Sequence, residues 1–371
     1  MKFRWLFVLL FLSGISFGQK DIEKIESLMS AEKTEQARPL IDNALLESEN
    51  NPKLLLYKGM IIQNQIEITT PSIEKRIILD SAYYFYTQSY RYDTKKYLTN
   101  ILAENLESVA QQLAYTGMEQ FNEAKYSSAI ETFEKAILIS DLEYVNHLDT
   151  MLWYNSAITS EKLSDYTKAE KYYMLILKYN PNDWNTIVAL ANTYKLENKE
   201  NKYISLIKKA NNENPRVGLF YNEIIGYYLE KKDNDSALIY LDKLIALDKY
   251  NDKMYYLKGS ILQEKGELNQ ANLQYEKSIE INPENVDANY NLAVNKYNNA
   301  MDLLKNKKLN KSERAKKNQY LEEVVQHLLI VRKYEPENKY LLTMLLVSYD
   351  ELDLKNEKDK IEMEIKSLKE E

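Results

Sequence analysis

The residues best suited to acid–base or metal chemistry are the two histidines of the chain, His147 and His327. They lie far apart in the sequence, and the chain has no cysteine, no Gly-rich phosphate loop, no Gly-x-Ser-x-Gly elbow and no His-Glu-x-x-His motif. A metal site needs several converging ligands, and a lone histidine is more often a surface or packing residue. The sequence therefore predicts no catalytic residue, no cofactor-binding residue and no metal site.

Tyrosine and asparagine offer a different chemistry, because they recur on one face of a series of expected helices. An asparagine amide can pair with both the donor and the acceptor of a peptide backbone, and tyrosine combines apolar area with a polar tip. Such residues suit a groove that binds a peptide or protein segment. Alternatively, they are tolerated surface residues in a chain with 31 tyrosines. We call the set the first-helix stripe; its members are Tyr154, Asn185, Asn192, Lys195, Asn222, Lys253, Tyr256, Tyr290 and Tyr297.

The elements that position this stripe are clearest between Asn251 and Pro283. Apolar and small residues fall at helical offsets in two runs separated by Gly266, and Pro283 prevents the second run from continuing as a helix. Small residues at Gly259 and Ala271 let two helices cross closely. The pattern predicts a helix, a turn and a second helix, with stripe residues such as Tyr256 largely exposed on the first.

This helix pair repeats along the chain. Ala169, Tyr203, Ala237 and Ala271 follow one another at intervals of 34 residues, and prolines keep the same spacing. Over roughly residues 110–283 the pattern resembles the tetratricopeptide repeat, and the whole chain resembles a group of secreted bacterial tetratricopeptide proteins. The resemblance implies an all-α fold, a right-handed α-solenoid of antiparallel helix hairpins whose first helices line the concave side.

Insertions in the spacing give the expected organisation of the chain. Between Asp93 and Phe121 the apolar residues predict one long helix, and the array as a whole is expected to form one elongated body. The expected segments are 1–18, a signal peptide; 19–109, divergent helical hairpins; 110–283, regular repeats; 284–336, an elongated hairpin with a Lys-rich tip; and 337–371, a C-terminal capping hairpin.

The first 18 residues have the pattern of a secretory signal peptide. A charged start at Lys2 and Arg4 precedes a short apolar run, and small residues at Ser16 and Gly18 predict cleavage before Gln19. We therefore expect an exported protein, periplasmic or secreted, with no integral membrane span after cleavage. Loss of two positive charges changes the formal net charge from -7 to -9, and this acidic balance argues against nucleic acid as a partner.

These observations favour a non-catalytic scaffold or adaptor that binds a peptide or protein segment in a concave groove. Two alternatives stay open: a module that binds envelope glycan or cell wall through its tyrosines, and a helical enzyme. The Lys-rich tip is a second possible binding surface, either for an anionic partner or as a merely solvated turn. Its basic residues are Lys305, Lys307, Lys308, Lys311, Arg314, Lys316 and Lys317.

Overall fold

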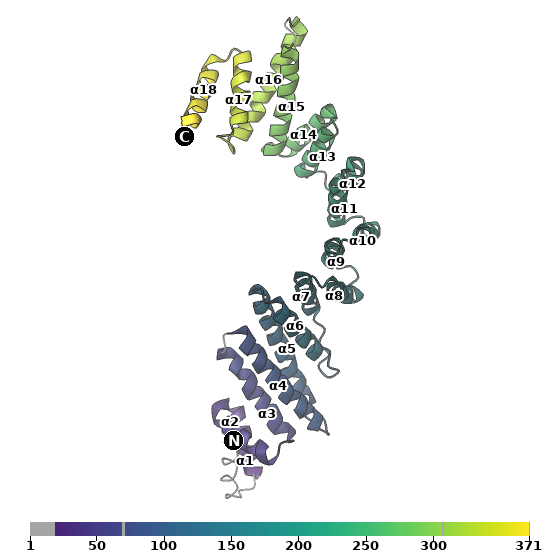
Figure 1. Cartoon of the computed structure of the whole chain (residues 1–371), viewed down its shortest axis with the longest axis vertical. Helices are drawn as coiled ribbons and strands as arrows, with labels where there is room; N and C mark the ends of the chain where they lie inside the picture. Colours follow the sequence, from purple (N-terminus) through teal and green to yellow (C-terminus); the bar gives the residue numbers. More distant parts are fainter. Residues whose placement is uncertain (1–18, 69–70, 306–307, 371) are drawn as a thin grey trace, which may run out of the picture. The chain divides into compact units, whose positions relative to one another are not determined.

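The computed structural model describes residues 19–68, 71–305 and 308–370, and these contain eighteen α-helices, one 3-10 helix and no strand (Figure 1). The predicted all-α class is therefore confirmed. The chain divides into two compact units, Met1–Tyr203 and Ile204–Glu371. The boundary lies within the stretch 110–283 that the repeat spacing treats as one segment. The predicted signal peptide lies outside the described residues, and no described helix is long and apolar enough to cross a bilayer.

The first unit consists of consecutive antiparallel helices, and α3 to α6 lie side by side in Figure 1. Two of them, α4 and α5, are longer than the others. The predicted long helix after Asp93 is present but begins only at Thr99. The elements are α1 (Gln19–Ser30), α2 (Thr34–Glu47), α3 (Pro52–Gln63), η1 (Asn64–Ile68), α4 (Ser72–Tyr92), α5 (Thr99–Asn122), α6 (Tyr126–Ser140), α7 (Thr150–Lys162), α8 (Tyr166–Tyr179) and α9 (Trp184–Leu196).

The second unit continues the same alternation of helix and short turn. Its longest hairpin is α15–α16, whose helices of 19 and 22 residues compare with 13 and 14 residues in α13 and α14. Helix α10 (Glu200–Glu213) contains the boundary between the units. The remaining elements are α11 (Gly218–Glu230), α12 (Asn234–Leu247), α13 (Asp252–Glu264), α14 (Leu268–Ile281), α15 (Val286–Leu304), α16 (Lys311–Arg332), α17 (Lys339–Glu351) and α18 (Lys355–Glu370).

Many helices begin at an aspartate or asparagine that caps the free N–H groups of the first turn. The side chain of Asp165 accepts a hydrogen bond from the N–H of Lys168 at 3.0 Å, and Asn285 does the same for Ala288 at 2.9 Å. Asn310 and Glu313 form a complete capping box at the start of α16. Short polar residues in the sequence thus fix where these helices start.

In the described part of the chain, seven of the hairpin turns share one backbone feature, a single residue with positive φ between the two helices. Gly266 adopts φ 79°, which glycine tolerates at no steric cost. Residues with a Cβ take the corresponding place in the other six of these turns, with φ between 57° and 60°: Glu32, Ala124, Ser164, Asn198, Lys232 and Asp353. The repeat therefore imposes this conformation on side chains that do not favour it.

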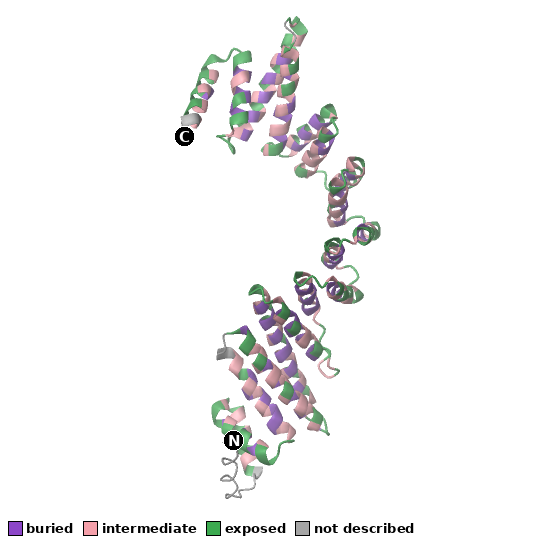
Figure 2. Ribbon diagram, viewed as in Figure 1, coloured by how far each residue is buried: buried purple, intermediate pink, exposed green. Residues whose placement is uncertain are grey.

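The helices of three hairpins cross where a glycine faces an aromatic ring. A Cβ added to Gly259 would lie 2.5 Å from Cε1 of Tyr275, a contact too short for any unmoved structure. Ala271, predicted to lie at the same crossing, is completely buried, and Figure 2 shows the buried residues on the helix faces that meet their neighbours. The equivalent pairs are Gly59 with Tyr86 and Gly117 with Phe133.

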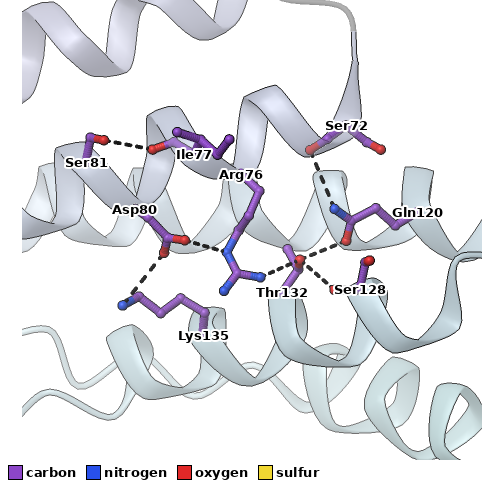
Figure 3. A network of polar contacts seen from close by, with 9 residues as sticks. All are labelled: Ser72, Arg76, Ile77, Asp80, Ser81, Gln120, Ser128, Thr132 and Lys135. Carbon is purple, nitrogen blue, oxygen red and sulfur yellow. Dashed lines mark hydrogen bonds and ion pairs between the residues drawn. The ribbon is translucent and has the colours of Figure 1, made fainter.

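A polar network joins the N-terminal part of α4 to α5 and α6 (Figure 3). The guanidinium of Arg76 donates to Asp80 Oδ2 and to Thr132 Oγ1, both at 2.8 Å, and Thr132 donates to Gln120 Oε1 at 2.7 Å. Lys135 of α6 lies 3.7 Å from Asp80. The network holds three helices together, and Asp80 Oδ1, which is buried without a hydrogen-bond partner, has the Lys135 ammonium as its nearby counter-charge.

Candidate functional site

The first unit carries four residues of the first-helix stripe, on α7 and α9. Asn185, Asn192 and Lys195 are exposed, as the sequence predicts for groove residues. Lys195 Nζ lies 5.7 Å from the centre of the Tyr203 ring. Tyr154 is only half-exposed, because its ring packs edge-on against Tyr173 with 5.8 Å between the centroids. The polar members of the stripe thus face solvent while the tyrosine belongs partly to the core.

The second unit carries the other five residues, on α11, α13 and α15, and they divide in the same way. Asn222 and Lys253 are exposed. Tyr256, Tyr290 and Tyr297 are half-buried and pack against the hydrophobic clusters beneath them. The prediction that Tyr256 is largely exposed is wrong. The tyrosines form a fixed apolar floor, and the asparagine and lysine are the free polar groups beside it.

Tyr256 shows how this floor is held. Its ring lies 6.0 Å from the ring of Tyr275, at an interplanar angle of 34°. Burial raises the pKa of its hydroxyl, the charge of Asp287 adds to the rise, and a hydrogen bond from Asn291 opposes it. The phenol is therefore neutral at physiological pH and can both donate and accept hydrogen bonds. Asn291 comes from α15, so Tyr256 links two consecutive first helices.

A buried chain of hydrogen bonds lies beneath the stripe in this unit. Asn291 donates to the hydroxyl of Tyr275 at 3.3 Å, and that hydroxyl donates to Gln263 Oε1 at 3.2 Å. Asn295 donates to the same oxygen at 2.9 Å and to Asn272 Oδ1 at 2.8 Å. Burial raises the pKa of Tyr275 to about 12. These bonds fix α13 and α14 against α15, and so set the spacing of the stripe.

The first unit contains two counterparts of this chain. The hydroxyl of Tyr86 donates to Gln63 Oε1 at 2.7 Å, and the Gln63 amide donates to two residues of α5. Glu161 accepts hydrogen bonds from Thr193 and Tyr173. Burial raises the pKa of Glu161, and these two hydrogen bonds oppose the rise. Gln63, Glu161 and Gln263 hold equivalent places, so we call them the connector residues.

The sequence holds a signal for the connectors that the stripe analysis overlooked. An acceptor stands at the connector place in each hairpin whose second helix presents a tyrosine hydroxyl there, namely at Gln63, Glu161 and Gln263. Hairpins that instead present Phe133, Ile207 or Leu241 have Phe121, Lys195 or Leu229 at that place. An oxygen acceptor therefore accompanies each buried phenol, which would otherwise be left unsatisfied.

The two histidines lie in different units of the chain and have different surroundings. His327 is half-buried, and its Nδ1 lies 2.8 Å from Asn289 Oδ1, so this nitrogen carries the proton. Burial lowers the pKa of His327. His147 lies on the surface, 3.2 Å from Glu107. Among the described residues, no three histidine, aspartate or glutamate side chains gather in a way that could hold a metal ion.

Not every basic residue that was predicted for the Lys-rich tip is exposed there. Lys317 is buried and pairs with the Glu351 carboxylate at 2.8 Å, so its assignment to the exposed tip is wrong. Lys305 pairs with Asp302 at 2.7 Å, and Lys307 lies outside the described residues. The remaining basic residues are exposed: Lys308, Lys311, Arg314 and Lys316.

Repeated helix pairs with small residues at their crossings define an α-helical repeat protein. The family model of the tetratricopeptide repeat matches residues 152–183, and a second TPR repeat model matches residues 259–299. The chain thus contains tetratricopeptide repeats within an all-α fold. Repeats of this kind are scaffolds for contacts with proteins or peptides.

Similar proteins include the TPR repeat-containing protein MJ1428 of Methanocaldococcus jannaschii, which is 25% identical over 288 residues. That alignment covers 72% of this chain and 45% of the relative, so the chain spans less than half of the relative's length. Among solved structures, the C-terminal part of a TPR repeat-containing protein from Cytophaga hutchinsonii is 17% identical and has a TM-score of 0.48; 68% of this chain and 93% of that chain are covered. YrrB, described as a TPR protein with an unusual peptide-binding site, is 14% identical with a TM-score of 0.35, covering 52% and 95%.

Proposed function

We propose that this protein is an exported, non-catalytic scaffold that binds an extended peptide or protein segment over the first-helix stripe of its second unit. The observation that carries the proposal is the arrangement of half-buried tyrosines beside exposed Asn222 and Lys253 on consecutive first helices. Apolar floors with polar neighbours suit a peptide, which brings both side chains and backbone amides.

The fixed tyrosines favour binding because their rings are ordered before a partner arrives. Tyr256 already packs on Tyr275 and bonds with Asn291, so little rotamer freedom is left to lose. Asn222 and Lys253 are free to adjust to the partner's backbone and charge. Tyrosines in such positions often contribute most of the binding free energy.

Export is the second part of the proposal, and the pattern of residues 1–18 supports it. The absence of cysteine is compatible with an oxidising compartment, because the fold then depends on packing alone. A periplasmic location and release from the cell both fit a scaffold role.

Site-specific photocrosslinking in intact cells tests the proposed surface. A photoreactive amino acid would replace Lys253 on α13 or, as the matched control, Leu273, which is 61% exposed on α14 of the same hairpin. The proposal predicts a discrete crosslinked partner from position 253 and none from position 273. The same product from both positions, or from position 273 alone, would contradict binding by the first helices.

A further inference from the structure

The first unit contains a cleft that is separate from the first-helix stripe. Its volume is about 330 Å³, within the range of small-ligand sites. It lies where the end of α2 and the turn before α3 meet the middle and end of α4. The residues that line it are Leu45, Glu49, Asn50, Leu55, Tyr84, Phe85, Gln88 and Tyr92.

Aromatic rings form a large part of this lining. Tyr84 and Phe85 lie edge to face with 5.3 Å between their centroids, and Tyr84 is 56% exposed. Tyr92 follows about two turns further along the same helix. A tyrosine this exposed gains little from folding, so its ring face is available to a ligand.

The polar groups of the cleft are also free. Within the described part of the chain, Glu49, Asn50 and Gln88 make no side-chain hydrogen bond or ion pair. The hydroxyls of Tyr84 and Tyr92 likewise have no hydrogen-bond partner there. This differs from the connector residues, whose polar atoms are satisfied within the fold. The cleft thus combines the exposed ring of Tyr84 with one carboxylate, two amides and two phenols that can bind a ligand, while the Arg91 guanidinium lies 5.7 Å from the centre of the Tyr92 ring.

We propose that this cleft binds a neutral oligosaccharide. The C–H face of a pyranose ring is apolar and weakly positive, which matches the negative face of a tyrosine ring. Its hydroxyls both donate and accept hydrogen bonds, as the amides of Asn50 and Gln88 do, and the carboxylate of Glu49 accepts two more. No lysine or arginine is among the lining residues, and the carboxylate of Glu49 would repel a phosphate or another anion.

A peptide is a weaker candidate for this cleft than for the first-helix stripe. The cleft has a volume of about 330 Å³, and its lining includes Glu49 and Asn50 of the α2–α3 turn together with Gln88 of α4, which offers several hydrogen-bonding groups to one compact ligand. The proposal concerns the first unit and does not depend on peptide binding by the second.

Calorimetric titration of the full-length mature protein with cellotriose, maltotriose and triacetylchitotriose tests the inference. We expect saturable binding of at least one trisaccharide below about 10 mM, and a loss of at least about tenfold in affinity for Tyr84→Ala and for Gln88→Ala. The matched control is Tyr115→Ala on α5, whose ring is 73% exposed outside the cleft. Its affinity should equal that of the wild type.

Three results would overturn the assignment. The first is that none of the trisaccharides binds. The second is equal affinity of wild type, Tyr84→Ala and Gln88→Ala, all with unchanged helical circular dichroism. The third is Tyr84-dependent binding of a decaproline peptide without trisaccharide binding, because aromatic grooves also accept polyproline helices and the cleft would then be a peptide site. If Tyr84→Ala fails to fold, Gln88→Ala carries the test alone.

Discussion

Replacing Gly259 by alanine isolates the packing of one helix crossing. The new methyl group would lie 2.5 Å from Cε1 and 2.7 Å from Cδ1 of Tyr275. This ring cannot withdraw easily, because it is completely buried and its hydroxyl is bonded to Gln263 and Asn291. Overpacking of this kind costs about 1 to 3 kcal/mol, whereas alanine in a helix interior gains about 1 kcal/mol over glycine. The net effect should be a loss of up to about 2 kcal/mol.

Gly226 provides the matched control in the same unit. It lies inside α11, and a Cβ added there meets no atom within 4 Å. Gly226→Ala should therefore show the helix gain alone, a stabilisation of about 0.5 to 1 kcal/mol. The two variants should change the free energy of unfolding in opposite directions, and they should differ by about 1 to 3 kcal/mol, which is the cost of overpacking.

Urea denaturation followed by circular dichroism measures both variants, and hydrogen exchange locates the effect. Because a repeat array can unfold in parts, exchange in α13 and α14 is the decisive readout. Faster exchange confined to these helices and their neighbours supports the crossing as described. If Gly259→Ala stabilises the protein as much as Gly226→Ala does, the close approach to Tyr275 is wrong.

Four further predictions follow from single residues. Glu161→Gln should stabilise the protein by about 1 kcal/mol at pH 7. Because the pKa of Glu161 is raised, the native state binds more protons than the unfolded state, and the contribution of Glu161 to stability is lost as pH rises through its folded pKa. Denaturation at pH 7 and pH 4 should therefore show that the variant's gain in stability over the wild type shrinks in acid. The lowered pKa of His327 has the opposite sign, so stability should fall as pH drops below about 6.5. His327→Gln should flatten this part of the pH profile, and an unchanged profile would contradict a role for His327. Lys232→Gly relieves a residue held at φ 57° and should raise the melting temperature, with a net gain of about 0.5 to 1 kcal/mol; an unchanged melting temperature would count against strain in the turn. Intact-mass measurement of the exported protein should give a chain beginning at Gln19, and a mass that includes residues 1–18 would contradict cleavage.

The sequence predicted the repeated hairpins well because they depend on local spacing. Gly266, Pro283 and the small residues at the crossings each determine a turn, an end or a contact within one repeat. The long helix after Asp93 was placed too early, because its apolar pattern extends through Tyr97, which is 81% exposed in the turn before α5. Periodicity does not tell an apolar residue in a turn from one in a helix.

Burial of the stripe tyrosines could not be read from one repeat, because it depends on the neighbouring hairpin. Tyr256 is covered by a contact with Tyr275 and a bond from Asn291, which lies in the next repeat. Lys317 is buried for a similar reason, since its partner Glu351 lies on α17. Contacts between repeats decide exposure, whereas contacts within a repeat decide the fold.

The connector residues were within reach of the sequence. Each tyrosine of a second helix that bonds to a connector has this glutamine or glutamate four residues after the small residue of the first helix, which is Gly59, Ala157 or Gly259. A buried phenol needs an acceptor, so the joint occurrence of Tyr173 and Glu161, or of Tyr275 and Gln263, predicts a hydrogen bond. Reading the stripe by exposure alone concealed this relation.

The most direct test of the central claim is titration of the photocrosslinked partner against two surface variants. The stripe variant carries Asn222→Arg and Lys253→Glu, and the tip variant carries Lys308→Glu and Lys311→Glu; all four residues are exposed, so each change should alter stability by no more than about 0.5 kcal/mol. The account predicts that the stripe variant binds at least about tenfold more weakly and that the tip variant binds like the wild type at physiological salt. Normal binding by the stripe variant together with lost binding by the tip variant would show that α15–α16 carries the interaction and that the first-helix stripe does not.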